Sequence, residues 1–302
     1  MKINDIEKLV SDIDGDIFFN YDLKKLNWFN IGGKAEIFFK PNTLKSLVKF
    51  LNIYSKRGKI FILGAGSNVL INDTLFPGVI IKLGRNFSNI SILNENLIVA
   101  GCATSQKNLS EYAKENNLGE MEFLSCIPGL VGGGIRMNSG CFEKEFKDIL
   151  VSVQYIDFNG TVKTINSKNI QFEYRGTNLP KDVIFLSATF KGIKKNKNKI
   201  QEKIDELKKK KEQSQPTRVK TGGSTFKNPK NKTEKKVWQL IKESIPNDLK
   251  FGDAQVSEKH SNFFVNTNNA SFNDMKTLID FVKNKVKEKT GIDISLEIII
   301  VE

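Results

Sequence analysis

Three side chains in the sequence stand where they could carry acid, base or charge-stabilising chemistry. Arg175 ends the tripeptide EYR before a glycine, and its guanidinium is the group that binds a carboxylate in a bidentate manner. Ser224 follows Gly222-Gly223 in a turn, where its hydroxyl could hand over a proton. Glu297 lies in an otherwise apolar stretch, where an ionised carboxylate costs free energy unless it faces solvent, a cation or a functional site. A turn serine and a polar strand edge are the plain structural alternatives for Ser224 and Glu297.

Two glycine-rich stretches indicate main chain that lies close against a ligand. Residues 64–69 read GAGSNV after an expected strand, and residues 127–140 read IPGLVGGGIRMNSG. Residues without a Cβ let N–H groups approach phosphates. The first stretch lacks the third glycine and the following helix of a Rossmann fingerprint, so that fold is disfavoured. We therefore expect a nucleotide-type cofactor, with Arg136 and Asn138 adding polar contacts; taken alone, the first stretch is equally typical of a plain turn.

The composition is that of a globular chain of about two domains. The 302 residues are 39% hydrophobic and 27% charged. No apolar run is long enough to span a membrane, and the first residues lack a signal-peptide pattern, so we expect a cytoplasmic protein with no membrane partner. Three scattered cysteines (Cys102, Cys126 and Cys141) and a single histidine (His260) argue against a disulfide framework, a metal site and a Ser-His-Asp triad.

The net charge of +13 is concentrated in one segment. Residues 191–236 contain 17 Lys or Arg against 5 Asp or Glu. Such a segment could bind nucleic acid or a small anionic substrate, or it could be the solvated face of a helix. Phe226 is its only aromatic residue, which argues against a base-stacking platform. A nucleic-acid-binding module is therefore the alternative from another functional class, and we expect no nucleic-acid partner.

The elements that must position these residues alternate between strand and helix patterns. Apolar runs bounded by Gly, Pro or Asn predict strands at residues 35–39, 59–63, 79–83 and 97–100. An Asn-Gly turn at 159–160 predicts a hairpin, with a further strand at 183–190 and a terminal strand at 294–302. Helical spacing of apolar residues predicts helices at residues 44–51, 107–116, 235–245 and 271–289, and a lysine-rich helix after Gly192. We place the main domain boundary at residue 192.

Seven sequence blocks in a fixed order resemble the UDP-N-acetylenolpyruvoylglucosamine reductase family, also called UDP-N-acetylmuramate dehydrogenase. The blocks are NWFNIGGKA, GAGSNVL, IPGLVGGGIRMNSG, EYR, GGSTFKNP, AQVSEKHSNFFVN and a terminal LE, from about residue 25 to the C-terminus. The resemblance implies an α+β fold. An FAD-binding region of the PCMH or vanillyl-alcohol-oxidase type would occupy residues 1–192, in two subdomains that divide near residue 85. A C-terminal α+β substrate-binding domain would occupy residues 193–302.

The resemblance also implies an NADPH-dependent flavoenzyme of peptidoglycan precursor synthesis. Such enzymes pass a hydride from NADPH to non-covalently held FAD. They then pass it to the double bond of UDP-N-acetylglucosamine enolpyruvate, which gives UDP-N-acetylmuramate. The implied partners are this sugar nucleotide and NADPH, and we expect a monomer. Another FAD oxidoreductase with the same cofactor fold, such as an alcohol oxidase, is the nearest alternative.

The functional residues of this family carry over onto matching positions. The resemblance implies that Arg175 polarises the substrate carboxylate, that Ser224 donates a proton and that Glu297 is its acid partner. Counting from Gly291 places Glu297 at the position of the acid, whereas aligning on Leu296-Glu297 leaves isoleucine there. The positions that match substrate contacts are Tyr174, Lys227, Asn228 and Gln255. The positions that match the flavin-binding loops are Gly64, Ala65, Gly66, Ser67, Asn68, Val69, Ile127, Pro128, Gly129, Gly132, Gly133, Arg136, Asn138 and Gly140.

Overall fold

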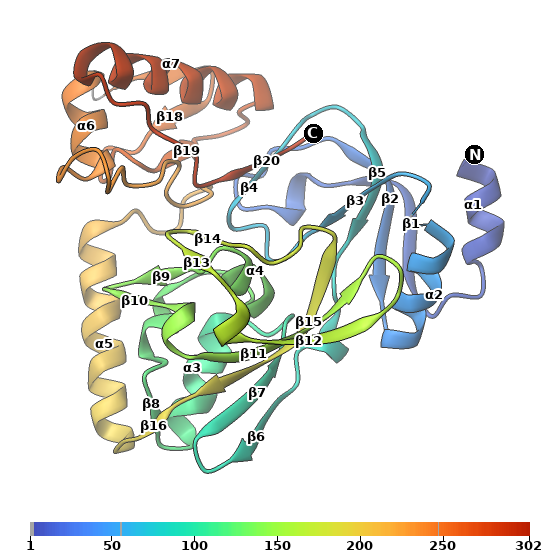
Figure 1. Ribbon diagram of the computed structural model, residues 1–302. Coiled ribbons are helices and arrows are strands. Elements are labelled where there is room, and N and C mark those ends of the chain that lie inside the picture. Colours follow the sequence, from blue (N-terminus) through green and yellow to red (C-terminus); the bar gives the residue numbers. More distant parts are fainter. Residues whose placement is uncertain (1–2, 55, 247) are drawn as a thin grey trace. The chain divides into compact units, whose positions relative to one another are not determined.

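The computed structural model describes residues 3–54, 56–246 and 248–302, which form two compact units (Figure 1). Unit 1 consists of the described residues up to Asn20, of Glu36–Ala65 and of Pro77–Lys210. Unit 2 consists of Tyr21–Ala35, Gly66–Phe76 and Lys211–Glu302. The chain thus changes from unit 1 to unit 2 at Lys210, later than the change in composition at Gly192. A division of the functional domains at residue 192 stays a prediction.

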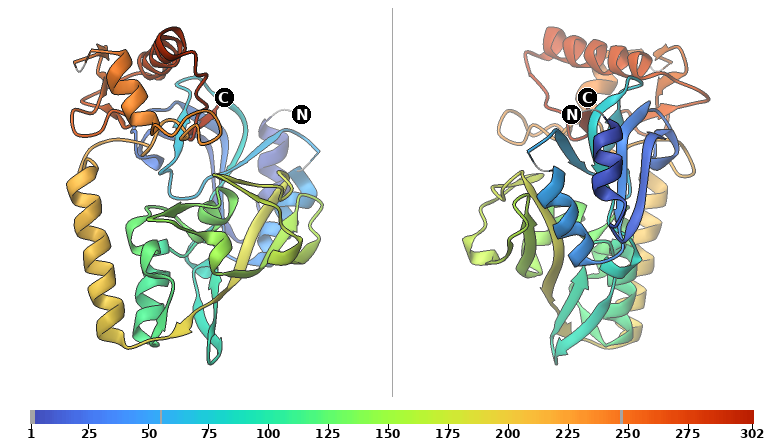
Figure 2. Two further views of the ribbon diagram at one scale, coloured as in Figure 1. Left: turned by 60° about the vertical axis from the view of Figure 1, so that its left-hand side comes forward. Right: turned by 90° about the vertical axis from the view of Figure 1, so that its right-hand side faces the viewer.

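The first sheet of unit 1 has the strand order β1-β2-β5-β3. Its strands are β1 (Gly15–Asp22), β2 (Lys34–Pro41), β5 (Phe76–Ile81) and β3 (Lys59–Ile62). Helices α1 (Ile3–Val10) and α2 (Leu44–Tyr54) lie side by side against it (Figure 2). Phe50 of α2 stacks on Phe39 of β2 with ring centroids 4.2 Å apart. Because β3 and β5 are parallel, their carboxyl ends meet at one edge of the sheet.

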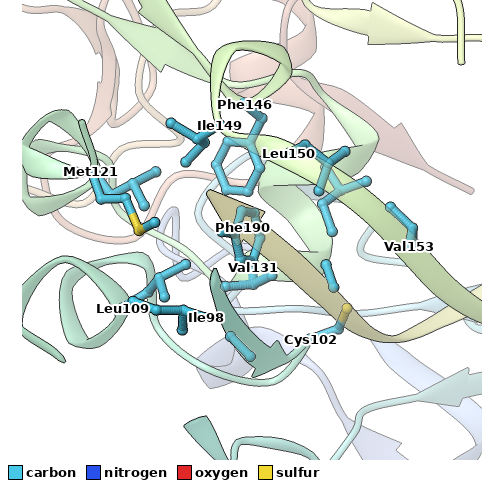
Figure 3. Close-up of a cluster of buried hydrophobic side chains, with 14 of the residues drawn as sticks. Ile98, Cys102, Leu109, Met121, Val131, Phe146, Ile149, Leu150, Val153 and Phe190 are labelled. Atoms are coloured by element: carbon cyan, nitrogen blue, oxygen red, sulfur yellow. The ribbon is translucent and has the colours of Figure 1, made fainter. Parts of the chain in front are cut away.

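The second sheet of unit 1 is antiparallel and has the order β12-β11-β15-β7-β6. Its strands are β6 (Ile90–Asn94), β7 (Leu97–Gly101), β11 (Leu150–Asp157), β12 (Val162–Asn166) and β15 (Val183–Lys191). The expected hairpin is confirmed, since Gly160 has φ +83° and Asp157 accepts hydrogen bonds from the N–H groups of Asn159 and Thr161. Figure 3 shows the core beneath this sheet, where Phe146 packs edge-on against Phe190.

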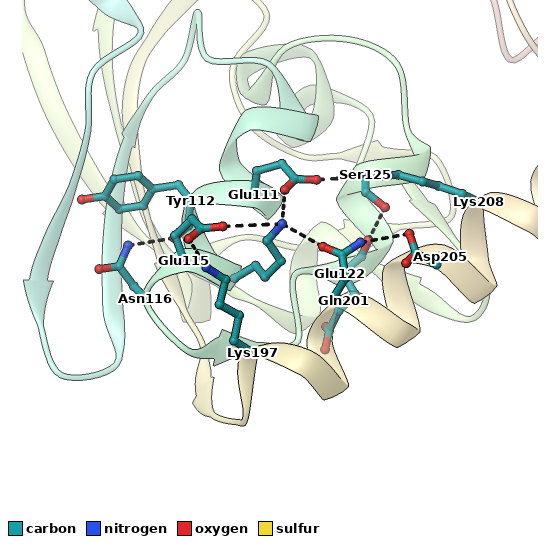
Figure 4. Close-up of polar contacts among 11 residues, drawn as sticks. Glu111, Tyr112, Glu115, Asn116, Glu122, Ser125, Lys197, Gln201, Asp205 and Lys208 are labelled. Carbon is teal, nitrogen blue, oxygen red and sulfur yellow. Dashed lines mark hydrogen bonds and ion pairs between the residues drawn. The ribbon is translucent and has the colours of Figure 1, made fainter.

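Polar contacts join the lysine-rich helix α5 (Lys197–Ser214) to α3 (Gln106–Glu115) at several points from Lys197 to Lys208. The Nζ of Lys114 lies 2.6 Å from Glu111 Oε2 and 2.8 Å from Gln201 Oε1, while Lys197 pairs with Glu115 (Figure 4). Leu207 is buried in the core of unit 1. Apolar burial and paired carboxylates therefore account for part of the basic segment without nucleic acid.

Short elements complete unit 1 and carry the second glycine-rich stretch. That stretch contains a helix, α4 (Val131–Arg136), which the glycine content had hidden from sequence reasoning. The other short elements are η2 (Arg85–Phe87), β8 (Leu118–Gly119), η3 (Glu122–Cys126), β9 (Gly140–Cys141), β10 (Lys144–Glu145), η4 (Phe146–Asp148), η5 (Ser167–Asn169), β13 (Phe172–Glu173), β14 (Gly176–Thr177) and β16 (Ile193–Lys194).

The described part of unit 2 combines helices and short strands around its own core. Its elements are η1 (Lys24–Leu26), β4 (Val69–Ile71), α6 (Val237–Ser244), β17 (Lys250–Phe251), β18 (Ala254–Val256), β19 (Phe264–Asn266), α7 (Phe272–Thr290) and β20 (Ile299–Val301). A capping box of Ser271 and Asp274 begins α7, and Gly291 with φ +71° ends it. Phe226 and Phe264 meet edge to face in the core. The expected helices at 235–245 and 271–289 are confirmed.

The expected terminal strand is shorter than predicted. It covers Ile299–Val301, where it pairs in parallel with β4. The preceding residues 295–297 instead bond to the main chain of residues 225–227. Glu297 therefore lies outside the strand, and strand alternation does not set its direction.

Within the described ranges, no helix is long and apolar enough to cross a membrane. Nor does that part of the chain contain a group of three or more His, Cys, Asp or Glu side chains placed to hold a metal ion. Cys102 is a buried free thiol, and Cys126 is also buried.

Candidate functional site

Arg175 lies at the tip of a hairpin in unit 1. Glu173 of β13 pairs with Gly176 of β14, which leaves Tyr174 and Arg175 in the turn. Arg175 has φ +58°, a left-handed conformation that is uncommon outside glycine and is maintained only where the surroundings fix it. Its Nη2 donates to the carbonyl oxygen of Gly140 at 2.8 Å, and its Cζ lies 5.0 Å from the centre of the Tyr174 ring. The hairpin therefore holds this guanidinium at a defined place on unit 1.

Glu145 supports the guanidinium and was missed by sequence reasoning. Its side chain is 15% exposed, and its Oε1 lies 3.9 Å from Arg175 Nη1. The other carboxylate oxygen accepts a hydrogen bond from Asn138 Nδ2 at 3.0 Å and lies 2.9 Å from Lys147 Nζ. Nothing in the local sequence around Glu145 distinguishes it from the neighbouring acids. Its position is visible only once the hairpin is folded against β9 and β10.

Asn138 connects the second glycine-rich stretch to this hairpin. The side chain is fully buried. Its Nδ2 also donates to the carbonyl oxygen of Glu173 at 3.1 Å, and its Oδ1 accepts from the Lys147 N–H at 3.0 Å. These bonds give Asn138 a structural role beside Arg175, and its contact with a cofactor stays a prediction.

The glycines of the two stretches differ in what surrounds them. A Cβ added to Gly134 would lie 2.3 Å from a ring carbon of Phe146, so the packing of unit 1 requires glycine there. A Cβ at Gly133 would meet no described atom within 4 Å, and one at Gly64 would meet only Leu130 Cδ1 at 4.0 Å. Since the protein's own packing does not explain these two glycines, they leave space for a ligand to approach the main chain.

The other expected cofactor residues of unit 1 are partly engaged within the protein. Arg136 Nη1 donates to the carbonyl oxygens of Leu179 and Pro180 at 3.1 and 2.7 Å, and burial lowers the pKa of its guanidinium. Gly132 N donates to the carbonyl oxygen of Cys102 at 3.0 Å. Gly129 has φ +123°. Ile127 and Pro128 precede α4, Gly140 begins β9, and Ala65 follows Gly64 at the end of the unit 1 segment. Their contacts with a cofactor stay predictions.

Unit 2 brings Ser224 and Glu297 together although they are far apart in the sequence. Phe226 pairs with Leu296, Lys227 N donates to the carbonyl oxygen of Ser295 at 2.8 Å, and Glu297 N donates to that of Thr225 at 2.8 Å. Thr225, whose carbonyl oxygen accepts the hydrogen bond from the Glu297 N–H, is the residue that directly follows Ser224.

The turn that carries Ser224 is fixed on two sides. Ser224 forms a bridge with Phe263. Gly223 before it has φ +80°, and a Cβ there would meet no described atom within 4 Å. The turn therefore requires glycine for its conformation and leaves space beside the hydroxyl-bearing residue.

The unit 2 part of the first glycine-rich stretch reaches Glu297. Asn68 Nδ2 donates to the carbonyl oxygen of Glu297 at 3.0 Å, and the carbonyl oxygen of Asn68 accepts from Ile299 N at 2.9 Å. Gly66 has φ +70°, and a Cβ there would lie 2.2 Å from the carbonyl oxygen of Leu26. Ser67 lies between them in the loop, and Val69 begins β4. An expected cofactor loop and the expected acid are thus neighbours within unit 2.

The expected substrate residues of unit 2 are half-buried, and one of them is bonded to the start of α6. Asn228 Oδ1 accepts a hydrogen bond from Val237 N at 2.9 Å, which ties it to that helix. Lys227 lies beside it on the Ser224 segment. Gln255 lies in β18, between Lys250 and Val265 of its neighbouring strands. The fourth expected substrate residue, Tyr174, belongs to the Arg175 hairpin of unit 1.

A pocket of about 280 Å³ in unit 2 was not predicted from the sequence. Trp238, Lys242, Lys259 and His260 are among the residues that line it. Burial lowers the pKa of His260, and its Nδ1 accepts from Asn262 N at 3.2 Å, so the neutral ring carries its proton on Nε2. The spacing of Trp238 and Lys242, one helical turn apart, was the available signal. An indole face can stack on a nucleobase and ammonium groups can bind phosphates, so this lining has the chemistry to bind a nucleotide.

Asn262 holds the main chain of the Ser224 segment. Its side chain is buried, its Oδ1 accepts from Phe226 N and its Nδ2 donates to the carbonyl oxygen of Phe226, both at 2.9 Å.

Asn262→Leu leaves both main-chain groups of Phe226 unpaired, so the free energy of unfolding should fall by about 2–5 kcal/mol in urea denaturation. The exposed Asn273→Leu on α7 is the control and should change it by less than about 0.5 kcal/mol. Equal stability of the two variants would show that the two hydrogen bonds from the Asn262 side chain to the main chain of Phe226 do not contribute to stability.

Comparison with known proteins gives concordant results over nearly the whole chain. The "FAD binding domain" model matches residues 35–166, and the model of the C-terminal domain of UDP-N-acetylenolpyruvoylglucosamine reductase matches residues 215–301. The UDP-N-acetylenolpyruvoylglucosamine reductase of Pelagibacter ubique is 57% identical over 298 residues, which are 99% of each chain. That of Rickettsia bellii is 42% identical over 286 residues, 95% of this chain and 94% of the relative. The crystal structure of the reductase (MurB) from Thermus caldophilus has a TM-score of 0.81 at 27% identity, covering 95% of this chain and 99% of that one.

These matches agree with the geometry of the site. The FAD-binding match spans both glycine-rich stretches, including Gly64 and Gly133, where the main chain is open to approach by a ligand. The expected α+β fold with an FAD-binding region is confirmed, and the chain is an FAD-dependent oxidoreductase. With a relative at 57% identity along nearly its full length, the chain belongs to the UDP-N-acetylenolpyruvoylglucosamine reductase family.

Proposed function

We propose that this enzyme uses NADPH to reduce UDP-N-acetylglucosamine enolpyruvate to UDP-N-acetylmuramate, a precursor of peptidoglycan. The family supports the substrate class. The observation that carries the chemistry is the pairing of the Ser224 segment with the Glu297 segment in unit 2, with the Glu297 N–H bonded to Thr225 at 2.8 Å. It places a hydroxyl group and a carboxyl group on neighbouring main chains, as a protonation step needs.

The reaction adds a hydride and a proton across the enolpyruvyl double bond. FAD, when bound, supplies the hydride that NADPH has donated, and this hydride goes to the methylene carbon C3. Negative charge then develops towards the substrate carboxylate, which Arg175 binds through its guanidinium. Ser224 donates the proton that C2 needs, so the product has two more hydrogen atoms than the substrate. Arg175 belongs to unit 1 and Ser224 to unit 2.

A serine hydroxyl is a weak acid, and its proton transfer needs support from its surroundings. Glu297 is proposed to act on the same proton, either as a protonated acid or by orienting a water molecule. Of the two alignments of the C-terminal end, the one that puts Glu297 at the position of the acid is supported by the main-chain bonds. The Glu297 N–H bonds to Thr225, next to Ser224, whereas Ile299 lies in β20 against Val69 of β4. Lys227 is on the same segment and can stabilise the alkoxide that remains after the transfer.

The remaining site residues are proposed to bind the two ligands. Main-chain groups of residues 64–69 and 127–140 would hold FAD. Tyr174, Lys227, Asn228 and Gln255 would hold the sugar nucleotide, and the Trp238 pocket of unit 2 extends the surface available to its uridine diphosphate. The location in the cytoplasm and the monomeric state stay predictions.

Steady-state turnover tests this function. Under anaerobic conditions the purified enzyme should oxidise more than one equivalent of NADPH only when UDP-N-acetylglucosamine enolpyruvate is present, and mass spectrometry should detect a product with two added hydrogen atoms. UDP-N-acetylglucosamine, which lacks the double bond, is the matched control and should give no oxidation beyond that one equivalent. Oxidation of a simple alcohol without any turnover of the enolpyruvyl sugar would instead identify an oxidase of the same cofactor fold.

A further inference from the structure

Lys82 is a half-buried ammonium group beside the first glycine-rich stretch. It directly follows β5, and its Nζ donates a hydrogen bond to the carbonyl oxygen of Gly64. In the described part of unit 1, no carboxylate pairs with it, and the nearby charge that acts on it is Lys40, of the same sign. Burial and, to a smaller extent, Lys40 hold the pKa of Lys82 below its usual value. A neutral carbonyl partner leaves most of the cost of burying this charge uncompensated.

The sheet explains why Lys82 and Gly64 meet. Strands β3 and β5 are parallel, with Ile62 opposite Ile81, so both chains leave the sheet at the same edge. Leu63 N donates to the carbonyl oxygen of Ile81 at 2.9 Å, which extends the pairing up to the glycine. In α/β sheets, ligands bind outside the carboxyl ends of parallel strands. Lys82 is thus at the edge where a ligand of this sheet is expected.

The space beside Gly64 gives a second, independent indication of a ligand. An added Cβ would meet only Leu130 Cδ1, at 4.0 Å. An ammonium group has three hydrogens, and the bond to the Gly64 carbonyl aims it at the loop where this space lies. A half-buried cation that no described carboxylate pairs with and an open glycine on one loop together form a site for an anion.

We propose that Lys82 binds the diphosphate of FAD, together with main-chain groups of Gly64 and Ala65. The match of residues 35–166 to an FAD-binding domain identifies the anion that comes to this edge. The bound diphosphate supplies the negative charge that the folded protein does not place beside Lys82. This role is separate from the proton transfer at Ser224, and a failure of the proposed reductase activity would not affect it.

Affinity for FAD, measured by quenching of flavin fluorescence on adding apoprotein, tests the proposal. Lys82→Met should raise the dissociation constant of FAD roughly 10- to 100-fold, as expected for a lost charge-assisted hydrogen bond, and Lys82→Arg should restore most of it. Lys163→Met removes one positive charge from an exposed, paired lysine on β12 and should change it by less than about twofold. Thermal unfolding of each apoprotein shows whether the variants fold.

Dependence on pH gives a second readout. Lys82 loses its proton at a lower pH than an ordinary lysine, and the bound diphosphate favours the protonated form. The affinity of the wild-type protein should therefore start to fall at a pH below the usual titration range of lysine, whereas that of Lys82→Arg should fall less because a guanidinium stays charged.

A folded Lys82→Met apoprotein that binds FAD within twofold of the wild-type affinity would overturn the assignment. If the bound flavin of that variant also had a shifted reduction potential, the ammonium group would lie beside the isoalloxazine ring instead of the diphosphate.

Discussion

Ser224→Ala should slow reoxidation of the reduced flavin by UDP-N-acetylglucosamine enolpyruvate by roughly 10²–10⁴-fold, the usual contribution of a positioned general acid. Alanine removes the proton that must reach C2, while the main chain of the turn, held by Asn262 and by the bridge to Phe263, keeps its conformation. Reduction of the flavin by NADPH requires no such proton and should keep its rate. Anaerobic stopped-flow absorbance of the flavin measures the two half-reactions separately.

Ser224→Cys is the informative control for this variant. A thiol also carries a proton and is a stronger acid than a hydroxyl, so part of the lost rate should return. If Ser224→Ala retained its flavin but reoxidised it at the wild-type rate, another group would be the proton donor. Water held near Glu297 would then be the next candidate.

Arg175→Met should slow the same half-reaction by roughly 10²–10³-fold, the loss seen when one charge-stabilising donor is removed from an active site. The developing charge on the substrate carboxylate would lose its guanidinium partner, and the KM for the sugar nucleotide should rise as well. Reduction by NADPH should be nearly unchanged. Stopped-flow rates at several substrate concentrations separate the effect on binding from the effect on chemistry.

Arg175→Lys tests whether the geometry of the guanidinium matters. A lysine keeps the charge but cannot reproduce the bond to the Gly140 carbonyl and the approach to Glu145 together. It should recover only a small part of the loss. An equal slowing of both half-reactions, with flavin content retained, would mean that Arg175 supports the fold or the cofactor and does not act on the enolpyruvyl substrate.

Local patterns in the sequence predicted most of the elements. The Asn-Gly hairpin, the apolar stripe of α7 and the lysine-rich α5 each follow from residues that are close in sequence, because the turn or the periodicity is itself the cause of the structure. The prediction was wrong where non-local bonds decide the structure. Helix α4 forms from residues of poor helix propensity, with Val131 N and Gly132 N bonded to the carbonyl oxygens of Thr104 and Cys102. The terminal strand is shortened because residues 225–227 compete for its main chain.

The candidate site shows the same division. The glycine-rich stretches and the Arg175, Ser224 and Glu297 motifs could be identified from the sequence because each is a short pattern with its own chemistry. Their neighbours could not, because Glu145 meets Arg175 only through the pairing of β9, β10 and the hairpin. Lys82 meets Gly64 only because two strands separated in sequence are parallel. Such residues carry no local signal, since burial and proximity are properties of the folded chain.

The absorbance spectrum of the purified protein through one cycle of reduction and reoxidation tests the central claim most directly. The protein should retain yellow FAD that denaturation releases unmodified. Anaerobic NADPH should bleach it, and one equivalent of UDP-N-acetylglucosamine enolpyruvate should restore the colour with formation of the saturated product. A protein that holds no flavin, or whose reduced flavin is reoxidised by oxygen but not by the enolpyruvyl sugar, would contradict the account.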